Sequence, residues 1–202
     1  MDRSGIQRLV PIILVLIIVI LAVAALVSLG RTLFGGTSSP APTPLTNSGK
    51  QALTNTFADR SVLMSVRGPI VAREDFHSYT VTVSPDARNM TTYEGYLGEK
   101  VDNDQIQNDT QAYTQFVYAL DRANLMEGSE LKGEENNTKG ICATGYLYEF
   151  EVRQGDNTIK KLWTTTCSGS RGSLAANLDQ VVRLFRLQIP DFSKLLSKIN
   201  FS

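Results

Sequence analysis

In this 202-residue chain, few residues have the side-chain type and the spacing that catalysis or metal binding requires. The single histidine is His77, and the two cysteines are Cys142 and Cys167. A Ser-His or Cys-His catalytic pair would have to use His77, which lies at a predicted strand start. Two cysteines and one histidine cannot complete a zinc site without carboxylates, and no C-x-x-C spacing occurs. The sequence therefore predicts no catalytic residue, no metal ligand and no cofactor.

Adjacent acidic residues occur in two predicted polar loops, at Glu74 with Asp75 and at Glu134 with Glu135. Two carboxylates can act as the acid and base of a glycosidase, but only at a defined separation in space. Adjacency in the sequence does not provide that separation. Phosphate-binding loops, H-E-x-x-H and G-x-S-x-G are missing from the sequence. An enzyme is therefore disfavoured, and an envelope hydrolase remains an alternative.

The two cysteines flank a predicted β-hairpin over residues 140–168. If the chain reverses at Gln154-Gly155, side chains that alternate with a period of two fall opposite one another. The facing pairs are then Phe150 with Ile159, Tyr146 with Trp163, and Cys142 with Cys167. Opposed residues of a hairpin lie near the Cα separation of about 5.5 Å that a disulfide needs. We therefore predict a Cys142–Cys167 disulfide, which requires an oxidising compartment.

Residues 9–29 form an uncharged apolar run near the start of the chain. At about 1.5 Å per residue, a helix of about twenty residues spans a hydrocarbon core of about 30 Å. The apolar part of a cleaved signal peptide is only about 7 to 15 residues long. Arg3 and Arg8 precede the run and Arg31 follows it, which places residues 1–8 in the cytoplasm. We therefore expect a single-pass cell-membrane protein, with residues 9–29 in the lipid bilayer as an uncleaved signal anchor.

The rest of the chain divides into a linker and one domain. Residues 30–49 are rich in proline, serine and threonine, which is typical of an exposed, extended linker. Residues 50–202 are enough for one extracytoplasmic domain with a single core. Basic and acidic residues number 20 each, so no strong positive field is available to attract nucleic acid. The composition therefore disfavours nucleic acid as a partner.

The pattern of residues 50–202 predicts an α+β fold, with an antiparallel sheet of about four to five strands and helices on one face. Strands are expected over 61–67, 79–83 and 90–96, the last two joined by a turn at Ser84-Pro85-Asp86. The 140–168 hairpin supplies two more strands.

Helices are predicted from apolar residues that recur with the helical period. A first short helix carries Ala52, Leu53 and Phe57, and Asn108 caps the next one. The stripe of that second helix consists of Tyr113, Phe116, Val117 and Leu120. Ser173 is predicted to cap a third helix and Asp191 a last short one. We expect all of them to bury their apolar stripes against the sheet.

Three short motifs mark the last third of the chain. Trp163 lies four residues before Cys167, and Leu184-Phe185 precedes Gln188-Ile189-Pro190-Asp191. In these motifs the chain is similar to small single-span envelope proteins of reduced-genome bacteria. The resemblance implies a bacterial setting and supplies no functional residues.

The sequence as a whole predicts a non-enzymatic binding or assembly module of the cell envelope, anchored in the membrane. Its expected partner is an envelope protein or a wall polymer. A membrane-tethered hydrolase is one alternative, and a pilin-like filament subunit is another. Gly5 is followed by Ile6-Gln7-Arg8, which departs from the start of a mature pilin. A deep cleft at His77 would favour the hydrolase, whereas an exposed apolar or aromatic patch would favour binding.

Overall fold

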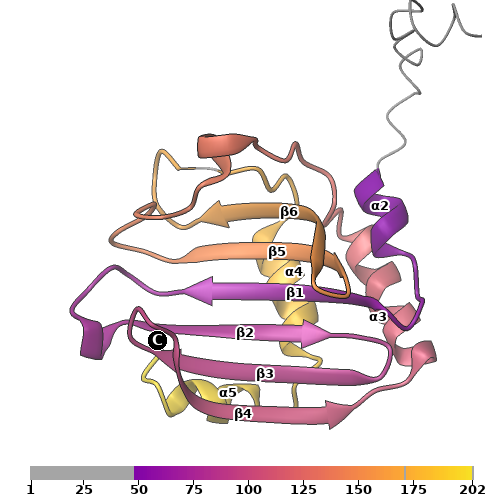
Figure 1. Cartoon of the computed structure of the whole chain (residues 1–202), viewed down its shortest axis with the longest axis horizontal. Coiled ribbons are helices and arrows are strands. Elements are labelled where there is room, and N and C mark those ends of the chain that lie inside the picture. Colours follow the sequence, from indigo (N-terminus) through magenta and orange to yellow (C-terminus); the bar gives the residue numbers. More distant parts are fainter. Residues whose placement is uncertain (1–47, 171, 202) are drawn as a thin grey trace, which may run out of the picture. The chain divides into compact units, whose positions relative to one another are not determined.

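The computed structural model of the chain describes residues 48–170 and 172–201, and a six-stranded antiparallel sheet is its central feature. The strand order is β4-β3-β2-β1-β5-β6 (Figure 1). The strands are β1 (Arg60–Arg67), β2 (His77–Val83), β3 (Ala87–Glu94), β4 (Glu99–Gln107), β5 (Leu147–Gln154) and β6 (Asn157–Thr165). The predicted α+β class is confirmed, but the sheet has six strands where about four to five were expected.

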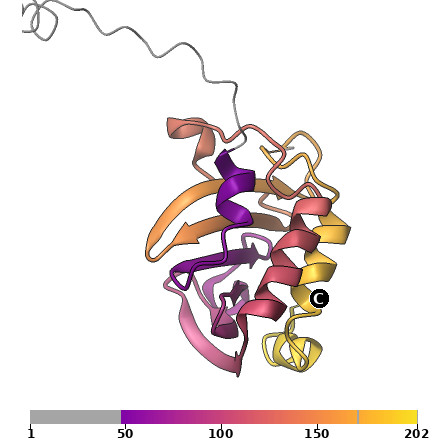
Figure 2. The same cartoon turned by 90° about the vertical axis from the view of Figure 1, so that its right-hand side faces the viewer.

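In the described part of the chain, α-helices cover one face of this sheet and the other face carries no α-helix (Figure 2). The α-helices are α2 (Ser48–Leu53), α3 (Thr110–Arg122), α4 (Leu178–Arg186) and α5 (Phe192–Ser197). Two short 3-10 helices, η1 (Arg73–Asp75) and η2 (Gly133–Asn136), lie in connecting segments. The predicted span at 9–29 and the linker as far as residue 47 lie outside the described residues. Within residues 48–170 and 172–201, no helix has the length and apolarity needed to cross a membrane.

The core lies between α3, α4 and the sheet. The predicted stripe of α3 is confirmed, with Tyr113, Phe116, Val117 and Leu120 all buried. Phe185 of α4 is completely buried, and its ring lies 5.2 Å from the ring of Phe116 and 5.9 Å from that of Phe150 on β5. One side chain therefore joins both long helices to the sheet.

Two of the three predicted helix caps need correction, whereas Asp191 is the N-cap residue of α5, although its side chain makes no capping hydrogen bond. Asp109 caps α3, because its carboxylate accepts a hydrogen bond of 2.8 Å from the backbone N–H of Ala112. The side chain of Asn108 instead donates to the backbone oxygen of Ser84 at 2.7 Å. Asn177, rather than Ser173, caps α4 by accepting from the N–H of Gln180. In both cases the true cap lies later in the sequence than the predicted one.

Two further corrections concern the ends of the expected elements. Phe57 lies beyond the end of α2 and is exposed, so it does not belong to the predicted first helix. β4 was not predicted, because its sequence EKVDNDQIQ has few apolar residues. It is an edge strand, and its Asp102 pairs with Lys198 near α5. Charged side chains are common on edge strands, where they oppose pairing with other chains.

The hairpin of β5 and β6 forms, but in a different register from the predicted one. Its turn is Gly155-Asp156, and a bulge lies between Val152 and Arg153. Gly155 has a φ of 54°, a conformation that glycine adopts without strain. The observed partners are Phe150 with Leu162 and Glu149 with Trp163. Trp163 therefore lies on the face opposite to Phe150, away from the helices.

Candidate functional site

Two connections meet at the end of the sheet where β1 and β3 finish, at the left of Figure 1. The ring of Tyr96, in the β3–β4 turn, stacks on Phe76, in the β1–β2 connection, with ring centroids 4.1 Å apart. The Tyr96 hydroxyl also donates a hydrogen bond of 2.6 Å to the backbone oxygen of Val71. Arg73, in the β1–β2 connection, also forms an ion pair with Glu99, the first residue of β4. Several independent contacts therefore hold the two connections together.

These connections carry large apolar side chains that are exposed to solvent. We define the end patch as Ile70, Val71, Tyr96 and Leu97. Leu97 is 80% exposed, and the other three are also exposed. Single exposed apolar residues are ordinary, but a group of them in contacting loops is typical of an interaction surface. An exposed apolar or aromatic patch was expected to favour a binding function, and the end patch is such a surface.

The Cys142–Cys167 disulfide lies at the same end of the sheet and confirms the predicted pairing. The two Cα atoms are 5.4 Å apart. Cys142 lies in the loop before β5 rather than on the strand, so the pairing was correct although the predicted strand register was wrong. Its neighbour Ala143 accepts a hydrogen bond of 2.8 Å from the N–H of Ile70. The disulfide therefore fixes a segment that supports the end patch.

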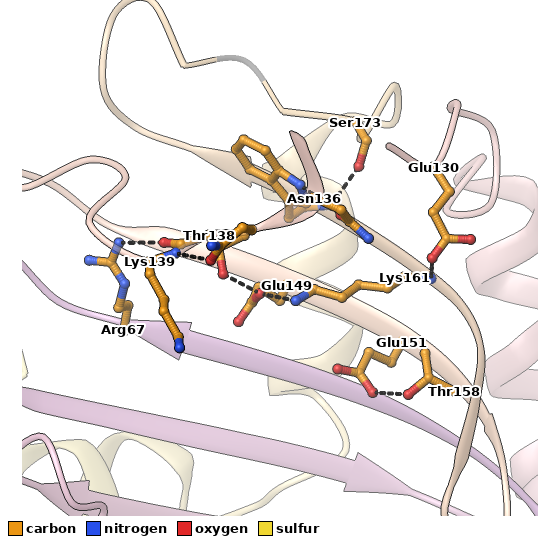
Figure 3. Close-up of polar contacts among 12 residues, drawn as sticks. Arg67, Glu130, Asn136, Thr138, Lys139, Glu149, Glu151, Thr158, Lys161 and Ser173 are labelled. Atoms are coloured by element: carbon orange, nitrogen blue, oxygen red, sulfur yellow. Dashed lines mark hydrogen bonds and ion pairs between the residues drawn. The ribbon is translucent and has the colours of Figure 1, made fainter. Parts of the chain in front are cut away.

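A segment that we call the strap, residues 130–141, crosses β5 and β6 on the face opposite to the helices (Figure 3). The indole Nε1 of Trp163 donates to Oδ1 of Asn136 at 3.1 Å. The hydroxyl of Thr138 donates to Oε1 of Glu149 at 3.0 Å, and Arg67 donates to the backbone oxygen of Ile141. The strap covers Trp163, which explains how a large aromatic side chain is buried on this face.

The charged groups under the strap form ion pairs or hydrogen bonds. Lys161 forms an ion pair of 2.5 Å with Glu149, and its backbone N–H donates to the Glu130 carboxylate at 3.0 Å. Burial lowers the pKa of the Arg67 guanidinium, and the negative charge of Glu149 opposes this shift. The hydroxyl of Thr158 donates to Glu151 at 2.7 Å. These acids hold the strap and the strands in place, which favours a structural role over acid–base catalysis.

We expect Asn136→Ala to loosen the strap, because the indole N–H of Trp163 then loses its partner. A lost hydrogen bond of this kind should lower the free energy of unfolding by about 1 kcal/mol. Amide hydrogen exchange over residues 130–141 should accelerate relative to that over the strands. Asn136→Asp keeps an acceptor oxygen and serves as the control, with slower exchange than the alanine variant. Equal exchange in both variants would contradict the proposed role of this hydrogen bond.

His77 is the first residue of β2 and lines a cavity of about 200 Å³ together with Asp75, Tyr146 and Phe201. This volume is below the roughly 300–1,000 Å³ of most small-molecule sites. Glu74 and Asp75 lie in η1, whereas Glu134 and Glu135 lie in η2 of the strap. In the described part of the chain, no group of three His, Cys, Asp or Glu side chains could hold a metal ion.

Neutral polar side chains lie on the face of the sheet opposite to the helices, in the half that β1 to β4 form. Ser65, Thr80, Thr91 and Asn103 follow one another across the four strands. The Thr91 hydroxyl lies 2.8 Å from Oδ1 of Asn103, which also accepts from Asn89 at 2.9 Å. Asn89, Thr91 and Asn103 therefore form hydrogen bonds to one another. The face is therefore a weaker candidate for binding than the end patch.

Sequence reasoning did not single out any residue of the end patch. One signal was available, because Tyr96 and Leu97 lie between Gly95 and Gly98, in a turn where polar residues are usual. The contact between the two connections depends on strand order, which the sequence pattern did not specify.

The chain was compared with protein-family models and with curated proteins. No protein-family model matches it, and no curated protein matches it either. A function for this chain is therefore argued from its own residues and their geometry.

Proposed function

We propose that this chain is a non-enzymatic binding or assembly module of the cell envelope, and that its end patch contacts a partner protein. In this proposal residues 9–29 anchor the chain in the membrane, with residues 1–8 in the cytoplasm. The domain that follows the linker lies outside the cytoplasm. The exposure of Leu97 beside Ile70, Val71 and Tyr96 is the observation that carries the proposal.

The end patch suits a protein partner because its apolar side chains are exposed while the segments beneath them are held in place. Removing apolar surface from water contributes about 25 cal/mol per Å², so covering these side chains would favour association. The stacking of Tyr96 on Phe76 and its hydrogen bond to Val71 fix the shape of the surface before binding. A surface that is already ordered loses less conformational entropy on association.

The disulfide supports an extracytoplasmic location for the domain. Disulfides persist in oxidising compartments and are rare in the bacterial cytoplasm. Protease added to intact cells should therefore remove the domain. Protection of the domain until the cells are broken would contradict the proposed location.

Site-specific photo-crosslinking in intact membranes tests the role of the end patch. A photoreactive residue at Leu97 should give one discrete protein adduct. The matched control is the same residue at Phe57, which is 72% exposed and precedes the start of β1, whereas the end patch lies where β1 ends. The Phe57 position should not give that adduct.

A second variant tests whether the apolar character of the end patch matters. Ile70→Asp places a charge in the patch, and the loss of one buried aliphatic side chain costs about 1.5–3 kcal/mol. The yield of the Leu97 adduct should therefore fall about tenfold or more, since 1.4 kcal/mol corresponds to a factor of ten. Identical adducts from Leu97 and Phe57, or an adduct unaffected by Ile70→Asp, would overturn the proposal.

A membrane-tethered hydrolase is the second candidate, and the cavity shared by His77, Asp75 and Tyr146 is the observation that favours it. In that case His77→Gln would abolish hydrolysis of envelope material by the full chain. The binding proposal expects His77→Gln to leave the Leu97 adduct unchanged. The pilin-like alternative depends on the amino-terminal residues, and a mature protein that begins at Ile6 by mass spectrometry would support it.

A further inference from the structure

A cavity of about 530 Å³ lies on the helical side of the molecule, where α4 and α5 meet. Its volume falls within the roughly 300–1,000 Å³ of small-molecule sites. Val182, Leu187 and Pro190 line it with apolar side chains, and Leu187 is 67% exposed. Ile189 and Phe192 also line it, but both are buried in the core. The helices thus form an apolar floor that is reached from solvent.

Two arginines of α4, Arg183 and Arg186, also line this cavity. They are three residues apart and therefore lie on the same side of the helix. Both are exposed, and neither guanidinium forms an ion pair with any residue in 48–170 or 172–201. Among the described residues of the lining, Asp179 is the one acidic side chain, so two arginines and one aspartate give these residues a net charge of +1.

Arg186 is held in position by an aromatic ring. Its guanidinium carbon lies 5.0 Å from the centroid of the Phe192 ring. This cation–π contact keeps a cationic group at the boundary between the apolar floor and solvent. A guanidinium in such a place can donate two parallel hydrogen bonds to a carboxylate or a phosphate.

The ordinary explanation for arginines in the last turn of a helix is attraction to the negative end of the helix dipole. This accounts for the positive charge of both Arg183 and Arg186, which lie in the last turn of α4. It does not account for two guanidinium groups without ion-pair partners in the described chain, beside an apolar cavity of this size. The combination of a cationic rim and an apolar floor is complementary to an amphiphilic anion.

We propose that this cavity, which we call the arginine cavity, binds a small amphiphilic anion. The ligand is an aliphatic or aryl group that carries one carboxylate or phosphate. Its apolar part lies on Val182, Leu187 and Pro190, and its anionic group pairs with Arg183 and Arg186. A lipid headgroup or a free metabolite could present this chemistry. The arginine cavity is separate from the end patch, so this inference does not depend on the proposed function.

Binding of 3-phenylpropionate to the full chain, held in nanodiscs of neutral phosphatidylcholine, tests the proposal. Ligand-detected NMR should show saturable binding of this acid. The uncharged 3-phenylpropanamide, with the same aryl group, should bind at least tenfold more weakly. Phenyl phosphate should compete with 3-phenylpropionate, because both present an anion on an aryl body.

Variants assign the binding to the arginine cavity. Arg183→Gln and Arg186→Gln should each raise the dissociation constant about tenfold, and the double variant should abolish binding. Arg122→Gln removes an exposed arginine of α3 that does not line the cavity, and it should bind like the wild type. Ser193→Trp, at an exposed position of the lining, should block the cavity while both arginines remain.

Nanodiscs that contain phosphatidylglycerol distinguish the two sources of the ligand. Displacement of the probe by this lipid identifies an anionic headgroup as the ligand, and continued probe binding identifies a free molecule. Equal binding of the acid and the amide would overturn the proposal. So would binding that survives the double arginine variant, or no saturable binding to the wild type.

Discussion

Phe185→Ala should lower the free energy of unfolding by about 4 kcal/mol, because it leaves a cavity at the centre of the core. The Phe185 ring is completely buried and meets Phe116 of α3 and Phe150 of β5. Its loss removes contacts to two other elements at once. Urea unfolding followed by circular dichroism should show a lower midpoint with a similar slope.

Leu187→Ala is the matched control for this substitution. Leu187 directly follows α4 and is 67% exposed, so its truncation should change stability by less than about 0.5 kcal/mol. A Phe185→Ala variant as stable as Leu187→Ala would show that α4 does not pack on the sheet as described.

Removal of the disulfide by Cys142→Ser with Cys167→Ser should have an effect of similar size. The bridge closes a loop between residues 25 positions apart, which constrains the unfolded chain. The chain-entropy relation gives a loss of roughly 3.5 kcal/mol for a loop of this length. Thermal and urea unfolding of the oxidised wild type and of the double variant measure the difference.

Reduced wild-type protein is the control for this experiment, because it lacks the bridge but keeps both cysteines. It should unfold at the same urea concentration as the double variant. We also expect faster amide exchange at Ile70, whose N–H donates to Ala143 beside the bridge. Equal stability of oxidised and reduced protein, with unchanged exchange at Ile70, would contradict a stabilising role for the disulfide.

The disulfide was predicted correctly although the predicted strand register of the hairpin was wrong. The sequence placed Cys142 on β5, whereas it lies in the loop before that strand. The turn at Gly155-Asp156 and the bulge after Val152 shift the pairing of the strands. The cysteines still meet, because both lie near the same end of one hairpin and a loop can adjust their separation. Local proximity was determined by the sequence, and strand register was not.

The sequence also determined the elements whose patterns are complete within a short stretch. The helical stripe of α3 predicted its buried face, because residues three and four apart lie on one side of a helix. The turn at Ser84-Pro85-Asp86 predicted that β2 and β3 pair, because it reverses the chain between two β-prone stretches. Such patterns require no information about distant residues.

Only the tertiary structure determined the features that join distant parts of the chain. β4 is a strand because β3 pairs with it, although its own sequence is largely polar. Trp163 is buried because the strap covers it. The alternating sequence pattern had predicted that Trp163 lies on the same face as Phe150, whereas it lies on the other face. The end patch and the arginine cavity exist because strand order and helix packing bring separate segments together, and no pattern within a short stretch encodes these distances.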